Sequence, residues 1–301
     1  IVFSPREYPE LLEYVGQSLV TSDGTTLLGA DCKAGVADIM TAFEYLAAHP
    51  EIPHGTLRAF FTPDEEVGCY GVDNIDLKKH PMDFAFTLDC GHLGQITYET
   101  FNGATANITV KGHNVHPGLA KNEMVNSIEV IEEFNAMLPK AQKPEYTEKR
   151  EGYFHVLKIA GDVEKTEEAI YVRDHDFARF EERKRLVADA ARYMNEKYGA
   201  GVVTVDLSDT YFNIANSMKN DMHIVETMKS VIRGIGAEPE IVPLRGGTDG
   251  TKLSAMGVPT PNLFAGGNLV HSIHEFVSVD TMEKSVEAVI GIARAYGEKH
   301  R

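Results

Sequence analysis

Apolar side chains recur along this chain at two spacings, one typical of helices and one typical of buried strands. Over residues 33–49 they fall every three or four positions, which predicts an amphipathic helix that Pro50 ends. Short apolar runs flank that helix and predict strands at residues 26–30, 57–62 and 84–88. Strands that alternate with helices favour an α/β domain whose mostly parallel sheet has helices on both faces.

The pattern changes near Tyr98 and changes back near Tyr211. Between these points the spacing predicts strands at residues 105–111, 152–159, 169–174 and 202–207, and helices at residues 123–138 and 177–198. This order is the βαββαβ arrangement of ferredoxin-like folds. We therefore expect an inserted ferredoxin-like domain over residues 99–211, between the two parts of the α/β domain at residues 1–98 and 212–301. The second part is predicted to contain helices at 222–235 and 281–299 and a strand at 241–243.

The composition narrows the class of protein. With 301 residues, of which 43% are hydrophobic, the chain can bury the cores of two domains. The formal net charge of −16 argues against nucleic acid or an anionic membrane as a partner, because both attract basic proteins. No apolar run approaches the roughly 18 residues of a membrane span. Cys32, Cys69 and Cys90 form no disulfide-like framework, which suits a reducing cytoplasm.

Acidic residues follow each of the first three predicted strands. Asp31 follows the first, the acidic run at residues 64–66 follows the second, and Asp89 follows the third. Unpartnered carboxylates are costly to desolvate near a core, and a bound cation removes that cost. Because ligands of open α/β sheets bind outside the carboxyl ends of the strands, these side chains are expected to meet. Taken singly, each acid is also consistent with an exposed turn or a helix N-cap.

A segment with two histidines, His271 and His274, adds imidazole to this set of oxygen donors. Zinc takes His nitrogen and carboxylate oxygen as ligands, and two metal ions about 3.5–4 Å apart that share a carboxylate can promote hydrolysis. The residues that come close to supplying such a pair are Asp31, Glu66, Asp89 and His271. Glu65 is then left over as a general base that takes a proton from water.

Five segments carry a resemblance to a known family: GADCKAG, FTPDEEVG, NVHPG, PLRGGTDG and HSIHEFV. They closely resemble the tripeptide aminopeptidases of the co-catalytic dizinc metallopeptidase family, which also includes carboxypeptidases and amino-acid deacylases. The resemblance extends over essentially the whole chain. It implies a dizinc metallo-aminopeptidase that hydrolyses the N-terminal residue from tripeptides, with two Zn²⁺ ions per subunit as the cofactor.

The resemblance also implies a role for each candidate ligand. Asp31 should bridge the two zinc ions. Glu66 and His271 should complete one zinc site, and Asp89 should belong to the other. Glu65 should be the general base that activates the metal-bridged water. The family's spacing, in which the ligand lies four residues before a Glu, selects His271 rather than the second histidine of its segment.

The inserted domain corresponds to the family's lid. His116 lies where the family places a histidine that polarises the scissile carbonyl. Arg173 and Arg245 resemble the arginines that bind the terminal carboxylate of the substrate, and Asn126 is a further candidate for this anchoring. Without the family context, His116 is also consistent with a turn and Arg173 with an ion pair to Asp174 or Asp176. The wider family further suggests a homodimer formed through the lid.

The chain departs from the family pattern in three places. The family carries a His-x-Asp motif upstream of the residue matched by Asp31, and its His is a zinc ligand; the first His here is His49. Because the chain opens at Ile1 rather than Met, we expect this motif to lie in a preceding segment. Cys32 and Cys90 each follow a candidate metal ligand, where family members carry other residues. Each thiol could bind zinc, be oxidised, or simply fill buried space.

Two other functions stay open on the sequence alone. A dipeptidase, a carboxypeptidase or an acyl-amino-acid deacylase would use the same architecture and chemistry, and would differ in its preference for free or acylated N-termini. A non-catalytic peptide-binding homologue is favoured by the absence of the His-x-Asp motif, since function lies in the site rather than in the fold. In each case the expected partner is a small peptide.

Overall fold

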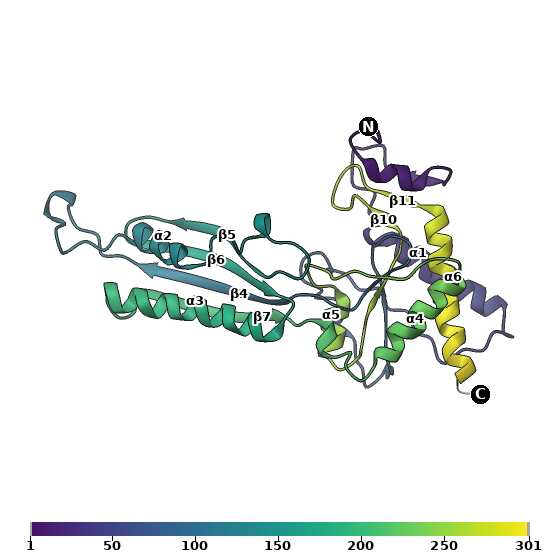
Figure 1. The fold of residues 1–301 in the computed structure, drawn as a ribbon. Helices are drawn as coiled ribbons and strands as arrows, with labels where there is room; N and C mark the ends of the chain where they lie inside the picture. Colours follow the sequence, from purple (N-terminus) through teal and green to yellow (C-terminus); the bar gives the residue numbers. More distant parts are fainter. Residues whose placement is uncertain (1, 300–301) are drawn as a thin grey trace. The chain divides into compact units, whose positions relative to one another are not determined.

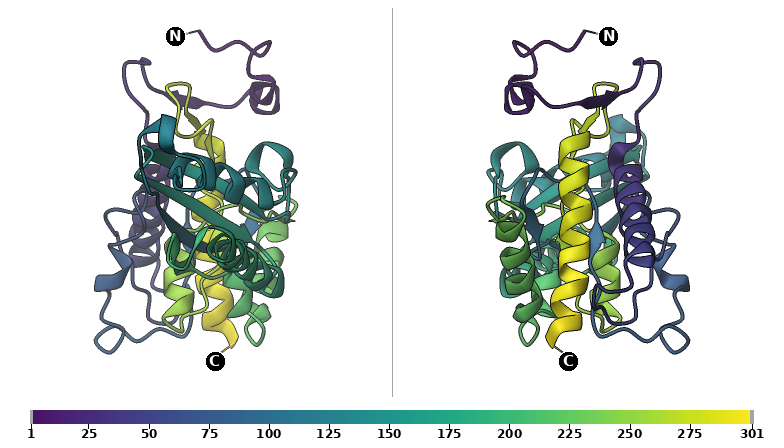
Figure 2. Two further views of the ribbon diagram at one scale, coloured as in Figure 1. Left: turned by 90° about the vertical axis from the view of Figure 1, so that its left-hand side faces the viewer. Right: turned by 90° about the vertical axis from the view of Figure 1, so that its right-hand side faces the viewer.

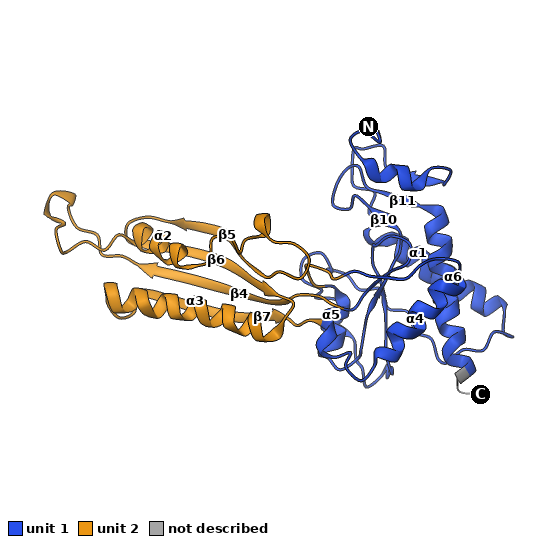
Figure 3. Ribbon diagram, in the orientation of Figure 1, with its two compact units in different colours: residues 1–98, 214–242, 248–301 blue, residues 99–213, 243–247 orange. Residues whose placement is uncertain are grey.

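The computed structural model describes residues 2–299, which fold into two compact units. Unit 1 comprises Ile1–Tyr98, Ile214–Val242 and Thr248–Arg301, and unit 2 comprises Glu99–Asn213 and Pro243–Gly247 (Figure 3). Unit 2 is therefore inserted twice into the path of unit 1. No helix among residues 2–299 is long and apolar enough to cross a membrane.

Unit 2 is built on a four-stranded antiparallel sheet in the order β5-β6-β4-β7. The strands are β4 (Asn102–Lys111), β5 (Tyr153–Gly161), β6 (Lys165–Asp174) and β7 (Val203–Tyr211). Helices α2 (Ser127–Met137) and α3 (Phe177–Tyr198) pack against each other and against this sheet (Figure 1). This is the predicted ferredoxin-like βαββαβ arrangement.

The core of unit 2 follows the alternation of its strands. Every second residue of β4 from Ala104 to Val110 is fully buried, and these side chains meet Phe134 of α2 and Phe180 of α3. Successive strand residues point to opposite faces, so one face of the sheet carries this apolar set. The helix predicted at residues 177–198 is confirmed at both ends by α3.

The described residues of unit 1 form four α-helices and two small sheets. The helices are α1 (Ala30–Ala48), α4 (Met222–Gly234), α5 (Asp249–Ala255) and α6 (Val279–Lys299). One sheet has the order β2-β9-β3-β8, formed by Thr87–Leu88, Asn262–Leu263, Gln95–Thr97 and Glu240–Ile241. The pairs β2–β9 and β3–β8 are parallel, and β9–β3 is antiparallel. The other sheet is antiparallel and joins β1 (Leu19–Thr21), β11 (Phe276–Ser278) and β10 (Gly267–Asn268).

The core of unit 1 lies between the four-stranded sheet and three helices. Buried side chains of α1, α4 and α6 gather on Leu88 of β2, Ile96 of β3 and Leu263 of β9. Helices α1 and α6 run beside each other in both views of Figure 2. The core therefore fixes the start of α1 against the end of β2, and two candidate metal ligands lie at these points.

Two strands predicted from apolar runs are wrong. Residues 26–29 form an irregular segment, residue 30 already belongs to α1, and residues 57–62 carry no strand assignment. Apolar sequence alone does not make a strand, because a strand needs a neighbour that satisfies its backbone groups. Among residues 2–299, no strand is paired with either segment, and Phe61 is half exposed. The strand predicted at 84–88 is confirmed at its end, as β2.

Candidate metal centre

Asp31 lies at the start of α1, where the buried carboxylate of Glu275 binds its backbone. Its φ of −85° and ψ of 99° are not helical, so the regular helix begins after Cys32. The side chain of Glu275 is buried and accepts hydrogen bonds from the backbone N–H groups of Gly29, at 2.6 Å, and of Asp31, at 2.9 Å. The local sequence does not identify Glu275 as a functional residue, although it is the Glu of the segment HSIHEFV, which begins with His271. Glu275 fixes the loop from which the Asp31 carboxylate projects.

The structure brings Asp31, Glu66 and His271 together. The Nε2 atom of His271 lies 3.0 Å from Oδ2 of Asp31 and 3.3 Å from Oε2 of Glu66. One ligand atom from each residue can be chosen so that all three lie within 4.8 Å of one another. The ring of His274, in contrast, packs on Tyr8, with a centroid separation of 4.8 Å. Of the two histidines in this segment, His271 is therefore the one that faces the carboxylates.

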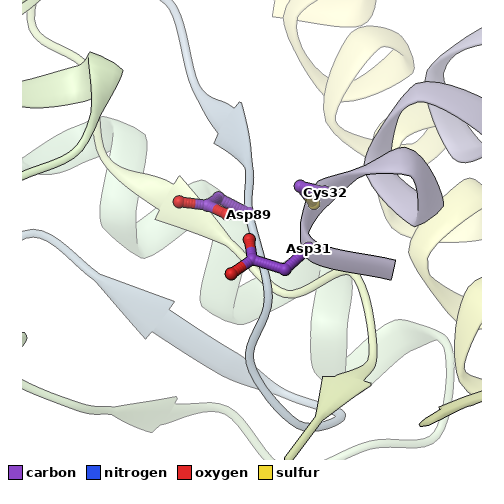
Figure 4. Close-up of side chains that lie close together, drawn as sticks. All are labelled: Asp31, Cys32 and Asp89. Atoms are coloured by element: carbon purple, nitrogen blue, oxygen red, sulfur yellow. The ribbon is translucent and has the colours of Figure 1, made fainter. Parts of the chain in front are cut away.

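Asp31 also belongs to a second group, with Asp89 and Cys32 (Figure 4). Asp89 directly follows β2, and its backbone N–H donates to the carbonyl of Leu263 on β9 at 3.3 Å. Ligand atoms of Asp31, Cys32 and Asp89 all lie within 4.8 Å of one another. Asp31 is thus shared between two groups of potential ligands, which is the arrangement that a bridging carboxylate requires.

Glu65 lies next to this centre in a group of its own. Burial, followed by the negative charge of Asp249, raises the pKa of Glu65 to about 7. The Cys69 thiol lies 3.5 Å from Oε1 of Glu65, and ligand atoms of Glu65, Cys69 and Asp249 lie within 4.8 Å of one another. A carboxylate with a pKa near neutrality can both accept and return a proton.

Asp249 is the second residue that the local sequence did not reveal. It opens α5, and its Oδ2 atom accepts a hydrogen bond from the Thr62 hydroxyl. Its Oδ1 atom is buried and has no hydrogen-bond partner in the structure. The sequence feature that could have pointed to Asp249 is its position in PLRGGTDG, one of the five segments on which the family resemblance rests. The Asp249 carboxylate places a further negative charge beside Glu65.

Backbone strain is concentrated in the turns that carry this centre. The φ angles of five non-glycine residues there are positive: Asp64 (64°), Cys69 (55°), Cys90 (45°), Leu269 (49°) and His271 (61°). Left-handed conformations of this kind cost about 1–3 kcal/mol each and persist where the surrounding structure holds them. They are found most often at active sites and ligand clamps. The strain therefore marks the same segments as the carboxylates.

The donor set fits divalent metal ions. Burial, followed by the electrostatic effects of Cys32, Asp31 and Glu65, raises the pKa of Asp89 well above its ordinary value. Carboxylates gathered in this way repel one another, and a divalent cation would relieve both the repulsion and the cost of burial. Imidazole with several carboxylate oxygens is also the donor set that zinc takes in catalytic sites.

Two predicted site residues of unit 2 cap short structural elements. His116 precedes the 3₁₀ helix Pro117–Leu119, and its Nδ1 atom accepts a hydrogen bond from the N–H of Gly118 at 3.1 Å. Asn126 is the N-cap of α2, and its side-chain oxygen accepts from the N–H of Ile128 at 3.0 Å. Both side chains thus have a local structural partner within unit 2.

Both predicted arginines lie near Tyr153 in unit 2. Arg173 is buried, donates to the carbonyl of Ala104 at 2.8 Å, and pairs across the sheet with Tyr153. The guanidinium of Arg245 lies 5.4 Å from the centre of the Tyr153 ring and donates to the carbonyl of Glu151 at 2.9 Å. Both guanidinium groups are thus held by acceptors of unit 2: Arg173 also donates to the carbonyl of Val172 at 3.0 Å, and Arg245 to the Thr147 hydroxyl at 2.7 Å.

Comparison with known proteins gives one family over most of the chain. A profile of peptidase family M20/M25/M40 matches residues 21–295. Peptidase T of Alkaliphilus oremlandii is 48% identical over 298 residues, which cover 99% of this chain and 73% of that protein.

Solved structures show the same fold. The aminopeptidase PepT of Bacillus cereus matches with a TM-score of 0.79 at 25% identity, over 92% of this chain and 74% of that one. A tripeptidase of Staphylococcus aureus matches with a TM-score of 0.80 at 21% identity, over 93% of this chain and 74% of that one. The chain therefore belongs to peptidase family M20/M25/M40, a family of metal-dependent peptidases, and is a metallopeptidase.

Proposed function

We propose that this protein is a dizinc aminopeptidase that removes the N-terminal residue of tripeptides. One observation carries the proposal: Asp31 is shared between a group with Glu66 and His271 and a group with Asp89, and Glu65 lies beside them. The high identity to proteins named Peptidase T supports the substrate class. A shared carboxylate with separate ligands on either side is what a two-metal hydrolytic site needs.

In this proposal some residues of unit 1 bind the metal ions and another transfers protons. Glu66 and His271 would hold one zinc ion, Asp89 would hold the other, and Asp31 would contribute to both sites. When bound, the ions supply Lewis acidity and make water acidic near neutral pH. Glu65 accepts the proton of the attacking water and returns it to the amine that leaves. Its partly buried position beside Asp249 supports this use.

The residues of unit 2 are proposed to bind the substrate. Arg173 and Arg245 would bind the C-terminal carboxylate of the peptide, and this contact would set the length that is accepted. Asn126 would assist in the anchoring, and His116 would donate a hydrogen bond to the oxygen of the scissile carbonyl as negative charge develops there. Support comes from the clustering of both arginines around Tyr153.

We further propose a homodimer formed through unit 2, in a reducing cytoplasm. Strand β5 lies at the edge of its sheet and exposes Val156, Leu157 and Ile159. An apolar edge strand offers unpaired backbone groups and apolar surface to a second copy. Cys32, Cys69 and Cys90 are all free thiols, which supports a reducing compartment.

A panel of peptides tests the substrate class. With zinc bound, we expect the tripeptide Ala-Ala-Ala to be cleaved. Its N-acetyl and C-terminal amide derivatives should each have a kcat/KM at least about 100-fold lower. Each derivative loses one charged contact, which is worth roughly 3 kcal/mol. Preference for the acetylated peptide would identify a deacylase, and preference for dipeptides a dipeptidase. Equal rates for the free acid and the amide would refute the role of the arginines.

The substitution Glu65→Gln separates catalysis from binding. General-base catalysis contributes about 10²–10⁴-fold, so we expect kcat to fall by that amount while zinc content and tripeptide binding stay unchanged. Zinc content is measured by atomic absorption and peptide binding by calorimetry. The exposed Glu44→Gln serves as the matched control. If the unsubstituted zinc-loaded protein binds tripeptides without turnover, the protein is a binding homologue and the proposal fails.

A further inference from the structure

We propose that Cys32 is a thiolate ligand of the metal ion held by Asp31 and Asp89, so that this half of the centre is a mixed sulfur–oxygen site. The inference rests on the metal centre proposed above and adds a ligand to it. Its basis is that Sγ of Cys32 and a carboxylate oxygen from each aspartate lie within 4.8 Å of one another (Figure 4). Cysteine thiolate is among the protein ligands that zinc takes, alongside carboxylate oxygen.

The thiol is held at the end of β2, where Asp89 also lies. Sγ of Cys32 lies 3.0 Å from the carbonyl oxygen of Leu88, the residue before Asp89. A Cβ atom on Gly35, one turn further along α1, would lie 3.0 Å from this sulfur, so the glycine leaves the space that the thiol occupies. The position of the sulfur is therefore set by packing between α1 and β2, as for a ligand that is oriented before metal binds.

A second thiol lies beside the first. The Cys90 side chain hydrogen-bonds to the side chains of Cys32 and Asp31. Its φ of 45° shows that the backbone is held in the left-handed region at this point. Cys90 does not belong to the group whose ligand atoms all lie within 4.8 Å of one another. We therefore assign coordination to Cys32, and to Cys90 the role of orienting the Cys32 sulfur.

A sulfur ligand changes which metals this half of the centre prefers. Thiolate is a soft ligand that favours Zn²⁺, Co²⁺ and Cd²⁺, whereas carboxylate oxygens accept Mg²⁺ and Mn²⁺ as well. The group of Asp31, Glu66 and His271 contains no sulfur. The two halves should therefore differ in selectivity. Metal binding would release the thiol proton that Cys32 now donates to Leu88.

Cobalt titration of the metal-free protein, kept reduced with a phosphine, tests the inference. Visible ligand-field bands report any bound Co²⁺, and a near-ultraviolet sulfur-to-cobalt charge-transfer band reports a thiolate ligand. We expect both in the unsubstituted protein. Cys32→Ser should lose the near-ultraviolet band, keep visible bands from the other half, and bind the Asp31–Asp89 cobalt about 10–100-fold more weakly. Cys90→Ser and Cys69→Ser should keep the near-ultraviolet band.

The possible failures are distinguishable. If no cobalt binds, the metal centre itself is refuted, and the proposed function with it. If visible bands develop without the near-ultraviolet band, the metal centre stands and the assignment of Cys32 is wrong. If the near-ultraviolet band survives in Cys32→Ser, or is lost in Cys90→Ser or Cys69→Ser, the sulfur ligand is another cysteine and the assignment is again wrong.

A second measurement needs no substitution, in case Cys32→Ser does not fold. The reduced protein is treated with iodoacetamide with and without metal, and mass spectrometry identifies which cysteines are alkylated. A coordinated thiolate is protected, so we expect Zn²⁺ to abolish alkylation of Cys32 and Mg²⁺ to leave it unchanged. Alkylation of Cys32 at the same rate with Zn²⁺ and with Mg²⁺ would overturn the proposal.

Discussion

Glu275 shows how one buried side chain can determine the geometry of a metal centre without binding the metal. It accepts hydrogen bonds from two backbone N–H groups of the segment that carries Asp31. Both donors precede the regular part of α1, where they have no partner within the helix. The carboxylate therefore replaces the missing helical acceptors and holds the shared ligand in place.

Replacement of Glu275 by Gln should weaken metal binding. The amide nitrogen of Gln would face an N–H donor in place of an acceptor, so one of the two hydrogen bonds would be lost. We expect the affinity for Zn²⁺, measured by competition with a chromophoric chelator, to fall about 10–100-fold. Glu238→Gln changes a highly exposed carboxylate and is the control. Equal affinities for the two variants would show that Asp31 is positioned by other contacts.

At the residue scale, the sequence revealed the candidate ligands but not the residues that support them. Asp31, Glu66 and His271 lie in short motifs of a type that metal ions bind, and the structure brings them together. Glu275 and Asp249 act through contacts with residues 244 and 187 positions away. Spacing within a motif carries no information about such contacts, because they depend on how distant segments pack.

The edge strand β5 is the element with the least protected surface in unit 2. Its residues from His155 to Gly161 are exposed along the strand, including the apolar Leu157 and Ile159. A bulge between Val156 and Lys158 interrupts its pairing with β6. Exposed edge strands tend to pair with further strands unless charge or twist prevents it, so β5 is where we place the dimer contact.

Charged substitutions on β5 should separate the dimer. We expect the unsubstituted protein to sediment as a dimer at micromolar concentration, and Leu157→Lys combined with Ile159→Lys to sediment as a monomer, because both charges would be buried at the interface. Thr204→Lys on β7, the opposite edge of the sheet, is the control and should remain dimeric. A monomeric unsubstituted protein would end the dimer proposal.

At the element scale, prediction succeeded where local signals and tertiary packing agree. The sequence marks both ends of helix α3. Asp176 caps its first turn by accepting a hydrogen bond from the N–H of Arg179, and Gly199 follows its last turn with a φ of 117°. Residues 57–62 show the opposite case. Their apolar run is as strong as that of β2, but β2 has a paired neighbour in β9, and residues 57–62 have none among residues 2–299.

For the molecule as a whole, one buried carboxyl links stability to pH. Asp38 lies on α1, is 1% exposed, and has one carboxyl oxygen without a hydrogen-bond partner. Burial raises its pKa to about 7, and a hydrogen bond with Ser285 of α6 opposes this only in part. Between about pH 4 and pH 7 the folded protein therefore retains a proton that the unfolded chain releases, so stability falls as pH rises through this window.

Asp38→Asn should remove the part of this dependence that comes from Asp38, while the raised pKa values of Glu65 and Asp89 keep their own contributions. The neutral amide does not ionise, so we expect the variant to be more stable than the unsubstituted protein at pH 8 by on the order of a few kcal/mol, since each pKa unit is worth about 1.4 kcal/mol. At pH 4 the two should differ little. Urea denaturation of the metal-free proteins measures both values, with the exposed Asp83→Asn as the control. A gain in stability that does not depend on pH would exclude ionisation as the cause.

The separation of Asp31 from His271 has a consequence for synthesis. These side chains meet in space, but 240 positions of sequence divide them, and the whole ferredoxin-like unit is made in the interval. While a ribosome is still adding residues to the chain, unit 2 can fold from its own local contacts, because domains generally form as units in the order of translation. The group of Asp31, Glu66 and His271 cannot close until residue 271 has emerged. If this group holds metal as proposed, a nascent chain would lack one half of its metal centre until synthesis is almost complete.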